Sequence, residues 1–166
     1  SDDLTYSGIV SGTGSVTKLG AGVLSLTGTN TYSGSTTIGA SGGVLRLAGS
    51  GSLGSGTYSG AIAIGASGEL QIGSTGAQVL SGNITGSGGL SKDTGVDSLT
   101  LSGTNSYSGS TTISTGTVIV GSNSALGASS AGTTIAEADL AAMRPGTGIS
   151  PAALPRIVGR VTARDI

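Results

Sequence analysis

Short blocks of alternating apolar and polar residues recur along the chain, separated by turns rich in Gly, Ser, Asn and Thr. Leu45-Arg46-Leu47 is typical, because period-two alternation places both leucines on one face of a strand and the arginine on the other. Glycine suits the turns because it adopts positive φ at little steric cost. Three such blocks follow one another before the series begins again, and this pattern predicts an all-β fold.

The tripeptide Tyr-Ser-Gly begins each series and contains every tyrosine of the chain. Its tyrosines are Tyr6, Tyr32, Tyr58 and Tyr107, and a degenerate copy begins at Leu80. The motif thus returns at a regular interval, of the length that is typical of solenoids, in which each repeat stacks on its neighbours. Three strands and three turns per period predict a parallel β-helix of about five coils.

Aligned on the tripeptide, the blocks fall into three sets, and each block is expected to pair in parallel with its equivalent one coil away. The first set comprises 9–10, 36–38, 61–64, 83–84 and 111–113; the second 16, 45–47, 70–72, 90 and 118–120; the third 24–26, 53, 79, 99–101 and 126. A sandwich of antiparallel strands shares this composition, but it does not explain why the tripeptide returns.

Composition narrows the classes of function. The chain has 33 glycines and 36% hydrophobic residues, and only 9% of its residues are charged. The rival of a disordered Gly/Ser linker is opposed by the positive mean hydropathy of +0.27 and by the recurring aliphatic blocks. A net charge of −1 gives no support for binding nucleic acid or anionic lipid. No apolar run has the length of a membrane helix, and an export signal is expected outside this sequence.

Residues 12–54 and 86–127 are near duplicates, in which Leu24 corresponds to Leu99. They resemble the passenger-associated transport repeat of bacterial surface proteins, whose pattern runs roughly G-S-G-x-L-x-K-x-G-x-G-x-L-x-L-x-G-x-N-x-Y-x-G-x-T-x-[IV]. The matching positions are Lys18 and Lys92, Asn30 and Asn105, and Tyr32 and Tyr107. The resemblance implies a right-handed parallel β-helix, an extracellular or cell-surface location, and export by an outer-membrane barrel that this sequence does not include.

After Thr134 the composition changes. Residues 135–166 contain four of the seven basic residues, all three prolines and the only methionine. The stretch that begins with Arg144, Pro145 and Gly146 resembles the later half of an SAF, or antifreeze-like, domain. In sialic acid synthases an arginine at the position of Arg144 reaches the sugar bound by a partner subunit, but the catalytic barrel of those enzymes has no counterpart here.

The chain is therefore expected to divide into a β-helix over 1–134 and an SAF-like half-domain over 135–166. The second part, with a short helix or turn and a β-clip-like segment, is expected to cap the solenoid, because exposed strand edges invite pairing with other chains. Self-association through the solenoid ends is the partner class that such edges suggest. A domain-swapped dimer is less favoured, because both copies lack the same strands.

Motifs for catalysis are weak. The chain has no histidine, so no Ser-His-Asp constellation exists. Residues 39–43 match G-x-S-x-G and residues 49–54 match G-x-G-x-x-G, but both lie among Gly/Ser-rich turns. Asp93 and Asp97 lie beside Lys92, and we expect a solvated loop there. No catalytic, cofactor-binding or metal-binding residue and no small-molecule substrate is predicted.

The threonine pairs at 36–37, 111–112 and 133–134 raise the alternative of an ice-binding surface, but the block alignment gives no continuous threonine ladder. The predicted function is a non-enzymatic stalk segment of an autotransporter-type surface protein that supports secretion, presentation or adhesion. Two alternatives stay open. One is a surface- or carbohydrate-binding module, in which the four tyrosines form an exposed face or internal stacking posts. The other is an engineered or shuffled chimera without native activity.

Overall fold

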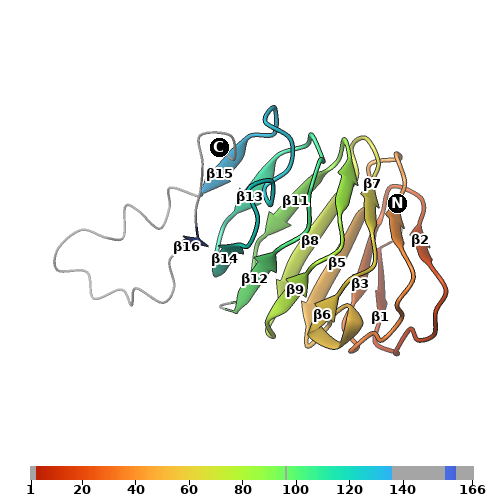
Figure 1. The fold of residues 1–166 in the computed structure, drawn as a ribbon. Coiled ribbons are helices and arrows are strands. Elements are labelled where there is room, and N and C mark those ends of the chain that lie inside the picture. The colour runs from red at the N-terminus through yellow and green to blue at the C-terminus, as the bar shows by residue number, and fades with distance from the viewer. Residues whose placement is uncertain (1–2, 96, 136–155, 160–166) are drawn as a thin grey trace, which may run out of the picture.

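Three parallel sheets wind around one axis to form a prism with three sides (Figure 1). The computed structural model describes residues 3–95, 97–135 and 156–159. Within these ranges every strand pairing is parallel, and the only helical element is the 3-10 turn η1 (Gly54–Gly56). None of the described residues belongs to a helix that could span a membrane. The predicted parallel β-helix is confirmed.

Each side of the prism is one sheet, and its strands come from successive coils. Sheet 1 contains, in order, β1 (Leu4–Tyr6), β3 (Val23–Leu26), β5 (Val44–Gly49), β8 (Glu69–Ser74), β11 (Gly89–Lys92), β13 (Thr111–Ile113) and β15 (Thr133–Ile135). Sheet 2 contains β2 (Val16–Lys18), β4 (Thr36–Ile38), β7 (Ile62–Ile64) and β10 (Ile84–Gly86). Sheet 3 contains β6 (Thr57–Tyr58), β9 (Gln78–Leu80), β12 (Ser98–Leu101), β14 (Thr117–Val120) and β16 (Arg156–Gly159).

The chain passes from sheet 2 to sheet 1 to sheet 3 in each full coil. Partner residues on neighbouring strands of sheet 1 are separated by one coil of the chain, as in the series Leu4, Leu24, Leu45 and Leu70. The seven strands of sheet 1 therefore span six turns of the solenoid. The expected number of five coils is slightly low, because most coils are shorter than the spacing of the tyrosine tripeptides.

The interior is a set of aliphatic columns. Period-two alternation holds where it was expected: Leu45 and Leu47 are fully buried, whereas Arg46 between them lies on the outer face. The neighbours of Leu45 along the axis are leucines at each step, so each coil covers the apolar surface of the previous one. The buried aliphatic core comprises Leu26, Ile38, Leu45, Leu47, Leu53, Ile62, Ile64, Leu70, Ile72, Leu80, Ile84, Leu90, Leu99, Leu101, Ile113, Val118, Val120 and Leu126.

The alignment of the three block sets is corrected by the sheet registers. Thr36–Ile38 lies in sheet 2, but its duplicate Thr111–Ile113 lies in sheet 1. In the same way Val23–Leu26 lies in sheet 1, whereas Ser98–Leu101 lies in sheet 3. The offset between the duplicates covers three coils and one further side of the prism. Duplicated residues therefore face the same interior from different sides.

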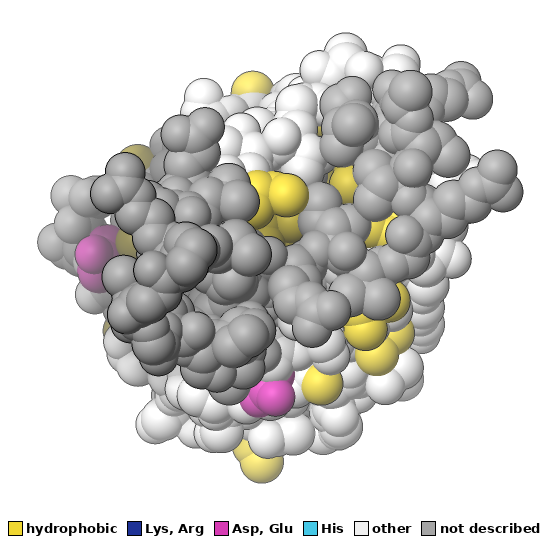
Figure 2. Space-filling view, turned by 90° about the vertical axis from the view of Figure 1, so that its left-hand side faces the viewer, with side chains coloured by type: hydrophobic (Ala, Val, Ile, Leu, Met, Phe, Trp, Pro, Cys, Tyr) yellow, Lys and Arg dark blue, Asp and Glu magenta, His cyan; other side chains and the backbone are white. Residues whose placement is uncertain are grey.

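The C-terminal expectations fall mostly outside the described residues. Arg144, Pro145 and Gly146 lie there, together with the expected helix or turn after Ile135. At the expected boundary, β15 runs through Thr134 to Ile135 and pairs with β13. Beyond it, β16 pairs in parallel with β14, so a strand from the C-terminal segment lies in sheet 3. Figure 2 views the prism from this end, and its visible side walls are mostly backbone and uncharged polar side chains.

Candidate functional site

The functional feature that the structure supports best is a set of buried polar side chains that tie neighbouring coils together, which we call the inter-coil ties. They are Asn30, Asn105, Gln78 and Tyr58. Four more polar side chains are buried beside them and bond within their own coil: Tyr32, Tyr107, Lys18 and Lys92. A buried polar group is costly unless it is hydrogen-bonded, so the partners of each one show what it does.

Asn30 joins three coils. Its Oδ1 accepts a hydrogen bond from the backbone N–H of Val10 at 2.9 Å, one coil earlier. Its Nδ2 donates to the carbonyl oxygen of Ser52, one coil later, at 3.1 Å, and to that of Gly28 at 2.9 Å. The side chain is completely buried, so it satisfies backbone groups at a corner where no strand ladder does so.

Asn105 repeats this arrangement in the second duplicate. Its Oδ1 accepts from the backbone N–H of Ile84 at 2.9 Å, and its Nδ2 donates to the carbonyl oxygen of Ala125 at 2.6 Å. The sequence comparison singled out both asparagines, and the structure gives them the same role on different sides of the prism.

Gln78 has a similar role that sequence reasoning missed. Its side chain is buried, accepts from the N–H of Leu53 at 2.9 Å and donates to the carbonyl oxygen of Leu53 at 3.1 Å. Its inward position could have been predicted from the sequence, because Gln78 lies two residues before Leu80 and alternation places both side chains on the inner face of the strand.

The tyrosines occupy different places on the prism, so they do not form the single exposed face that was one of the alternatives. Tyr6 ends β1 in sheet 1 and is 43% exposed. Tyr58 belongs to β6 in sheet 3, and Tyr32 packs against it. Tyr107 lies between β12 and β13 on another side. Tyr32, Tyr58 and Tyr107 are buried, so these three are internal posts and not an exposed binding face.

The buried tyrosines bond to threonines of the following strand. The hydroxyl of Tyr32 lies 2.7 Å from Oγ1 of Thr36, and the hydroxyl of Tyr107 lies 2.6 Å from Oγ1 of Thr111. Burial raises the pKa of Tyr107 to about 12 and raises the pKa of Tyr32 and Tyr58 as well, because a phenolate would be poorly solvated there. These hydroxyls are structural donors and acceptors.

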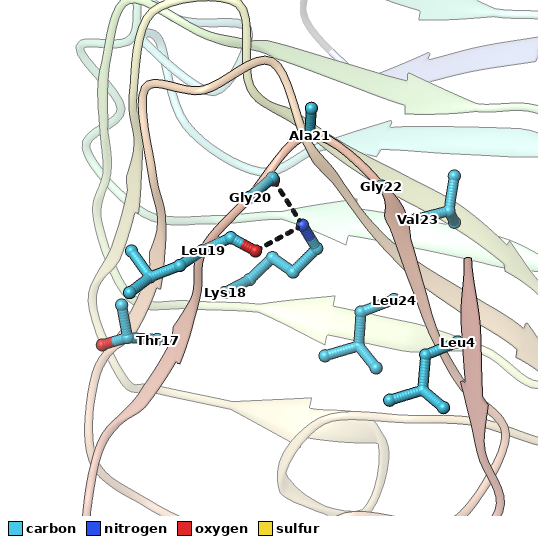
Figure 3. Close-up of a pocket in the computed structure, with 9 residues that line it drawn as sticks. All are labelled: Leu4, Thr17, Lys18, Leu19, Gly20, Ala21, Gly22, Val23 and Leu24. Atoms are coloured by element: carbon cyan, nitrogen blue, oxygen red, sulfur yellow. Dashed lines mark hydrogen bonds between the residues drawn. The ribbon is translucent and has the colours of Figure 1, made fainter. Parts of the chain in front are cut away.

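Lys18 points inward at the end of β2 and folds its amine back onto the following turn (Figure 3). Its Nζ donates to the carbonyl oxygens of Leu19 at 3.0 Å and of Gly20 at 2.7 Å. The aliphatic part of the lysine thereby extends the column of Ile38 and Ile64, while its ammonium group is hydrogen-bonded to turn carbonyls. Sequence reasoning had identified this lysine only as a family position.

Lys92 is the corresponding lysine of the second duplicate and is more completely enclosed. It pairs in register with Ile72 and Ile113, and its Nζ donates to the carbonyl oxygens of Thr94 and, at 3.0 Å, of Gly95. Burial lowers its pKa, and the nearby carboxylates of Asp93 and Asp97 partly oppose this shift.

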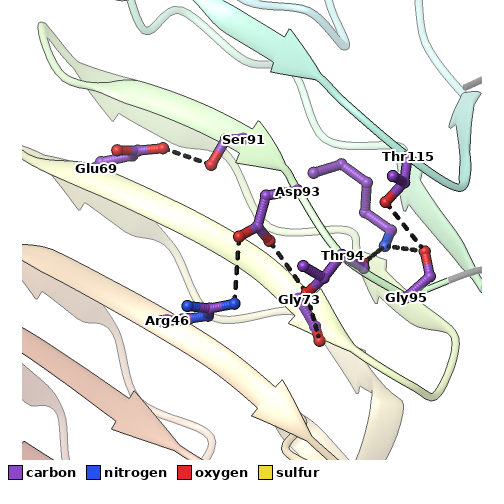
Figure 4. Close-up of polar contacts among 9 residues, drawn as sticks. Arg46, Glu69, Gly73, Ser91, Asp93, Thr94, Gly95 and Thr115 are labelled. Carbon is purple, nitrogen blue, oxygen red and sulfur yellow. Dashed lines mark hydrogen bonds and ion pairs between the residues drawn. The ribbon is translucent and has the colours of Figure 1, made fainter. Parts of the chain in front are cut away.

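A small group of polar side chains lies on the outer face of sheet 1, around Arg46 and Asp93 (Figure 4). Arg46 forms an ion pair with Asp93 at 3.3 Å, and the hydroxyl of Ser91 donates to a carboxylate oxygen of Glu69. The Thr94 hydroxyl donates to the carbonyl oxygen of Gly73 at 3.1 Å. Each charged group here is directed at another part of the same surface. These contacts join neighbouring coils across sheet 1.

The two glycine motifs form turns. Residues 39–43 connect β4 to β5, with Gly42 at φ +76°, and residues 49–54 connect β5 to the η1 turn, with Gly49 at φ +56°. Neither motif opens an α-helix, which both nucleophile elbows and dinucleotide sites require. Among the described residues, no three His, Cys, Asp or Glu side chains are grouped so that they could hold a metal ion.

The threonine pairs do not build one ladder. Thr36 and Thr111 point inward and are buried, so only the second threonine of each pair faces outward. Thr37 lies in register with Thr17 and Ala63 in sheet 2, whereas Thr112 lies in sheet 1 beside Thr134. The outward threonines are thus divided between two sides, and Ala63 interrupts the column in sheet 2.

Two segments, residues 16–47 and 93–120, match the family described as Passenger-associated-transport-repeat. No curated protein and no solved structure matched the chain. The first segment runs from β2 to β5 and includes Lys18, Asn30 and Tyr32; the second includes Asn105 and Tyr107. One match extends from sheet 2 through a full coil to sheet 1, so the family's repeat is longer than one coil. The match supports the resemblance to the passenger-associated transport repeat that the sequence had indicated, over these two segments.

Proposed function

We propose that this chain is a structural module of an autotransporter-type surface protein, a β-helix stalk segment that assists secretion and holds another segment away from the cell surface. The observation that carries the proposal is that each matched repeat contributes one asparagine that bonds to the coil before it and to the coil after it. A chain so built stabilises each new coil on the previous one.

The mechanism follows from these contacts. A coil that emerges from a translocation pore finds the edge of a completed coil, and parallel strand pairing, aliphatic burial and the asparagine ties all favour its addition. Because neighbouring coils supply nearly all of the contacts, stacking can proceed along the axis. Folding outside the cell would then oppose movement of the chain back through the pore.

The outer faces support a structural role over an enzymatic one. The charged side chains on sheet 1 are used in the Arg46–Asp93 pair and the Ser91–Glu69 bond. The tyrosines that could stack on a sugar are buried, apart from Tyr6. The proposed location is extracellular or on a bacterial cell surface, and the proposed partner is an outer-membrane translocator barrel; both rest on the repeat family.

Surface display tests the proposal. The chain is placed between an epitope tag and a translocator barrel, and antibody binding to intact cells is measured with protease resistance of the displayed chain. We expect Asn30→Ala/Asn105→Ala to reduce display and resistance, whereas Asn123→Ala, at an exposed position, leaves both unchanged. If a Gly/Ser linker of equal length is displayed as well as the parent, coil stacking has no part in secretion and the proposal fails.

We further propose that residues 135–166 close the C-terminal end of the solenoid. The pairing of β16 with β14 supports this, because it places a strand of this segment on the edge of sheet 3. A chain that ends at Thr134 is expected to aggregate where the full chain stays soluble, as measured by chromatography with light scattering. A truncated chain that stays soluble and has the same melting temperature as the full chain would contradict the proposal. The SAF-like motif at Arg144 stays a prediction.

A further inference from the structure

Two buried lysines, Lys18 and Lys92, are enclosed in the same way, by an arrangement that we call a lysine cage. Each cage comprises two carbonyl oxygens from the turn that follows the lysine and a glycine from the next coil. The carbonyls belong to Leu19 and Gly20 around Lys18 and to Thr94 and Gly95 around Lys92. Figure 3 shows how the amine of Lys18 folds onto its own turn.

The glycine of each cage lies close over the lysine. A Cβ at Gly43 would lie 2.5 Å from Nζ of Lys18 and 2.1 Å from an acceptor oxygen of the cage. A Cβ at Gly116 would lie 3.1 Å from Cε of Lys92 and 2.8 Å from an acceptor oxygen of that cage. The turn of the next coil can therefore close over the ammonium group and its acceptors only where that turn has a glycine.

The strand that stacks on each lysine has the sequence Thr-Thr-Ile. Thr36–Ile38 pairs with Val16–Lys18, and Thr111–Ile113 pairs with the strand that ends at Lys92, with the isoleucine beside the lysine in both pairs. The first pair lies in sheet 2 and the second in sheet 1. The lysine strand thus keeps the same kind of neighbour although its side of the prism changes.

The sequence of the paired strands does not by itself select this neighbour. A third Thr-Thr-Ile strand, Thr133–Ile135, pairs with Thr111–Ile113, so this sequence also stacks on a strand that has no lysine. The turns that follow the three strands differ. A glycine that closes a cage comes within five residues of the first two strands, but the ten residues after Ile135 contain no glycine. Only the first two strands are followed by a turn that can complete a cage.

Stacking becomes unfavourable when an ammonium group is buried without acceptors or when a side chain holds the covering turn away from it. We propose that Lys18 and Lys92 fix the register of coil stacking, because each allows as its neighbour only a strand whose turn completes its cage. A single buried polar residue fixes the register of coiled-coil helices by the same principle. The device matters in this chain because residues 12–54 and 86–127 are near duplicates that could otherwise exchange. It goes beyond the proposed function, since it holds whether or not the chain is secreted.

The pairing beside Lys92 can be tested by cross-linking, because the chain has no cysteine of its own. Ser91, Thr112 and Thr134 follow one another in register on the outer face of sheet 1. Neighbouring strands lie about 4.8 Å apart, which a disulfide can join, whereas strands two apart lie about 10 Å apart, which it cannot. Ser91→Cys/Thr112→Cys therefore reports the native pairing. Ser91→Cys/Thr134→Cys reports a chain in which the third Thr-Thr-Ile strand has replaced the second.

Both cysteine pairs are refolded from urea under oxidising conditions, with and without Lys92→Met, and intramolecular disulfides are quantified by mass spectrometry of peptides. We expect the chain with Lys92 to form only the native cross-link. Lys92→Met should still form the native cross-link and should raise the yield of the other by roughly tenfold or more above its background. The matched control Lys18→Met removes the other caged lysine and should leave both yields unchanged.

Three results would overturn the proposal. In the first, Lys92→Met forms only the native cross-link, so the lysine does not select the neighbouring strand. In the second, Lys92→Met forms neither cross-link, so the lysine is needed to build the strand and not to choose its partner. In the third, Lys18→Met raises the non-native yield as much as Lys92→Met does, so the effect does not depend on the cage beside the reporting strands.

Discussion

The ring of Tyr32 meets the ring of Tyr58 edge to face, with centroids 5.5 Å apart, and the two hydroxyls share Oγ1 of Thr36. The donor in each of these hydrogen bonds can be assigned, because each hydroxyl has only one proton to donate. Tyr58 donates its proton to the carbonyl oxygen of Gly34, so Thr36 must donate to Tyr58 and Tyr32 must donate to Thr36. A single chain of donors therefore links two neighbouring coils inside the core.

Thr36→Val should break this chain of hydrogen bonds. Valine has nearly the same shape, but it leaves the Tyr32 hydroxyl buried without an acceptor, which costs about 1–3 kcal/mol. The measurement is the free energy of unfolding in urea. Thr37→Val, on the outer side of the same strand, is the control and should change it by about 0.5 kcal/mol or less.

A double variant separates the hydrogen bond from packing. Tyr32→Phe/Thr36→Val removes the donor as well as the acceptor, so it should recover part of the loss. If Thr36→Val and Thr37→Val are equally stable, the buried hydroxyl of Thr36 contributes nothing to the tie between coils.

The inward columns and the turns could be predicted from sequence because both depend on local pattern. Leu45 and Leu47 alternate with Arg46, and this alternation alone determines which side chains are buried. The glycine motif at 39–43 was correctly assigned to a turn, because nothing near it had helical periodicity. The asparagines were found through the resemblance, as positions of the family pattern, and their hydrogen bonds between coils were not predicted.

The side of the prism on which each block lies could not be predicted, because it depends on the lengths of the turns, and the apolar pattern does not give these lengths. The step along the chain from Leu45 to its partner Leu70 is longer than the next step, from Leu70 to Leu90. Such differences accumulate, so the copies of the duplication lie on different sides of the prism. The inward position of Lys92 was also hidden, since a charged residue in an aliphatic column is stable only when turn carbonyls accept its protons.

Gly82 illustrates a second requirement of close stacking. A Cβ at this position would lie 2.2 Å from the carbonyl oxygen of Gly60 and 2.6 Å from that of Ser59, and backbone atoms cannot easily move away. Gly82→Ala should therefore destabilise the fold by roughly 1–3 kcal/mol, the usual cost of overpacking. Gly76→Ala is the control, because a Cβ there meets no atom within 4 Å and its φ is not positive. Thermal unfolding that does not distinguish the two variants would show that the coils are not in contact at this corner.

Leu101→Asp tests the inward assignment of sheet 3. Leu101 is fully buried between Leu80 and Val120, so an aspartate there would be an unpaired charge in an apolar column. We expect a loss of more than about 4 kcal/mol, seen as unfolding or aggregation at room temperature. Thr100→Asp introduces the same charge on the outer face of the same strand and should remain folded. A variant Leu101→Asp that melts within a degree or so of the parent would place this side chain outside the core.

The stability of the protein should fall in alkaline solution because of its buried tyrosines. The pKa of Tyr107 is raised from 10.0 to about 12, so the folded state holds its phenolic proton more tightly than the unfolded state. This contribution is fully present below about pH 10 and is lost as the pH rises toward about 12, and in full it amounts to about 3 kcal/mol. Unfolding in urea, measured at intervals between these pH values, should show a fall in the free energy of unfolding for the parent that is smaller for Tyr107→Phe.

The phenylalanine variant should also be less stable at neutral pH, because Thr111 loses its partner. Tyr6→Phe, at an exposed tyrosine, is the control. An identical alkaline fall in Tyr107→Phe and the parent would mean that Tyr107 titrates alike in the folded and unfolded chain, and its burial between the coils would then be wrong.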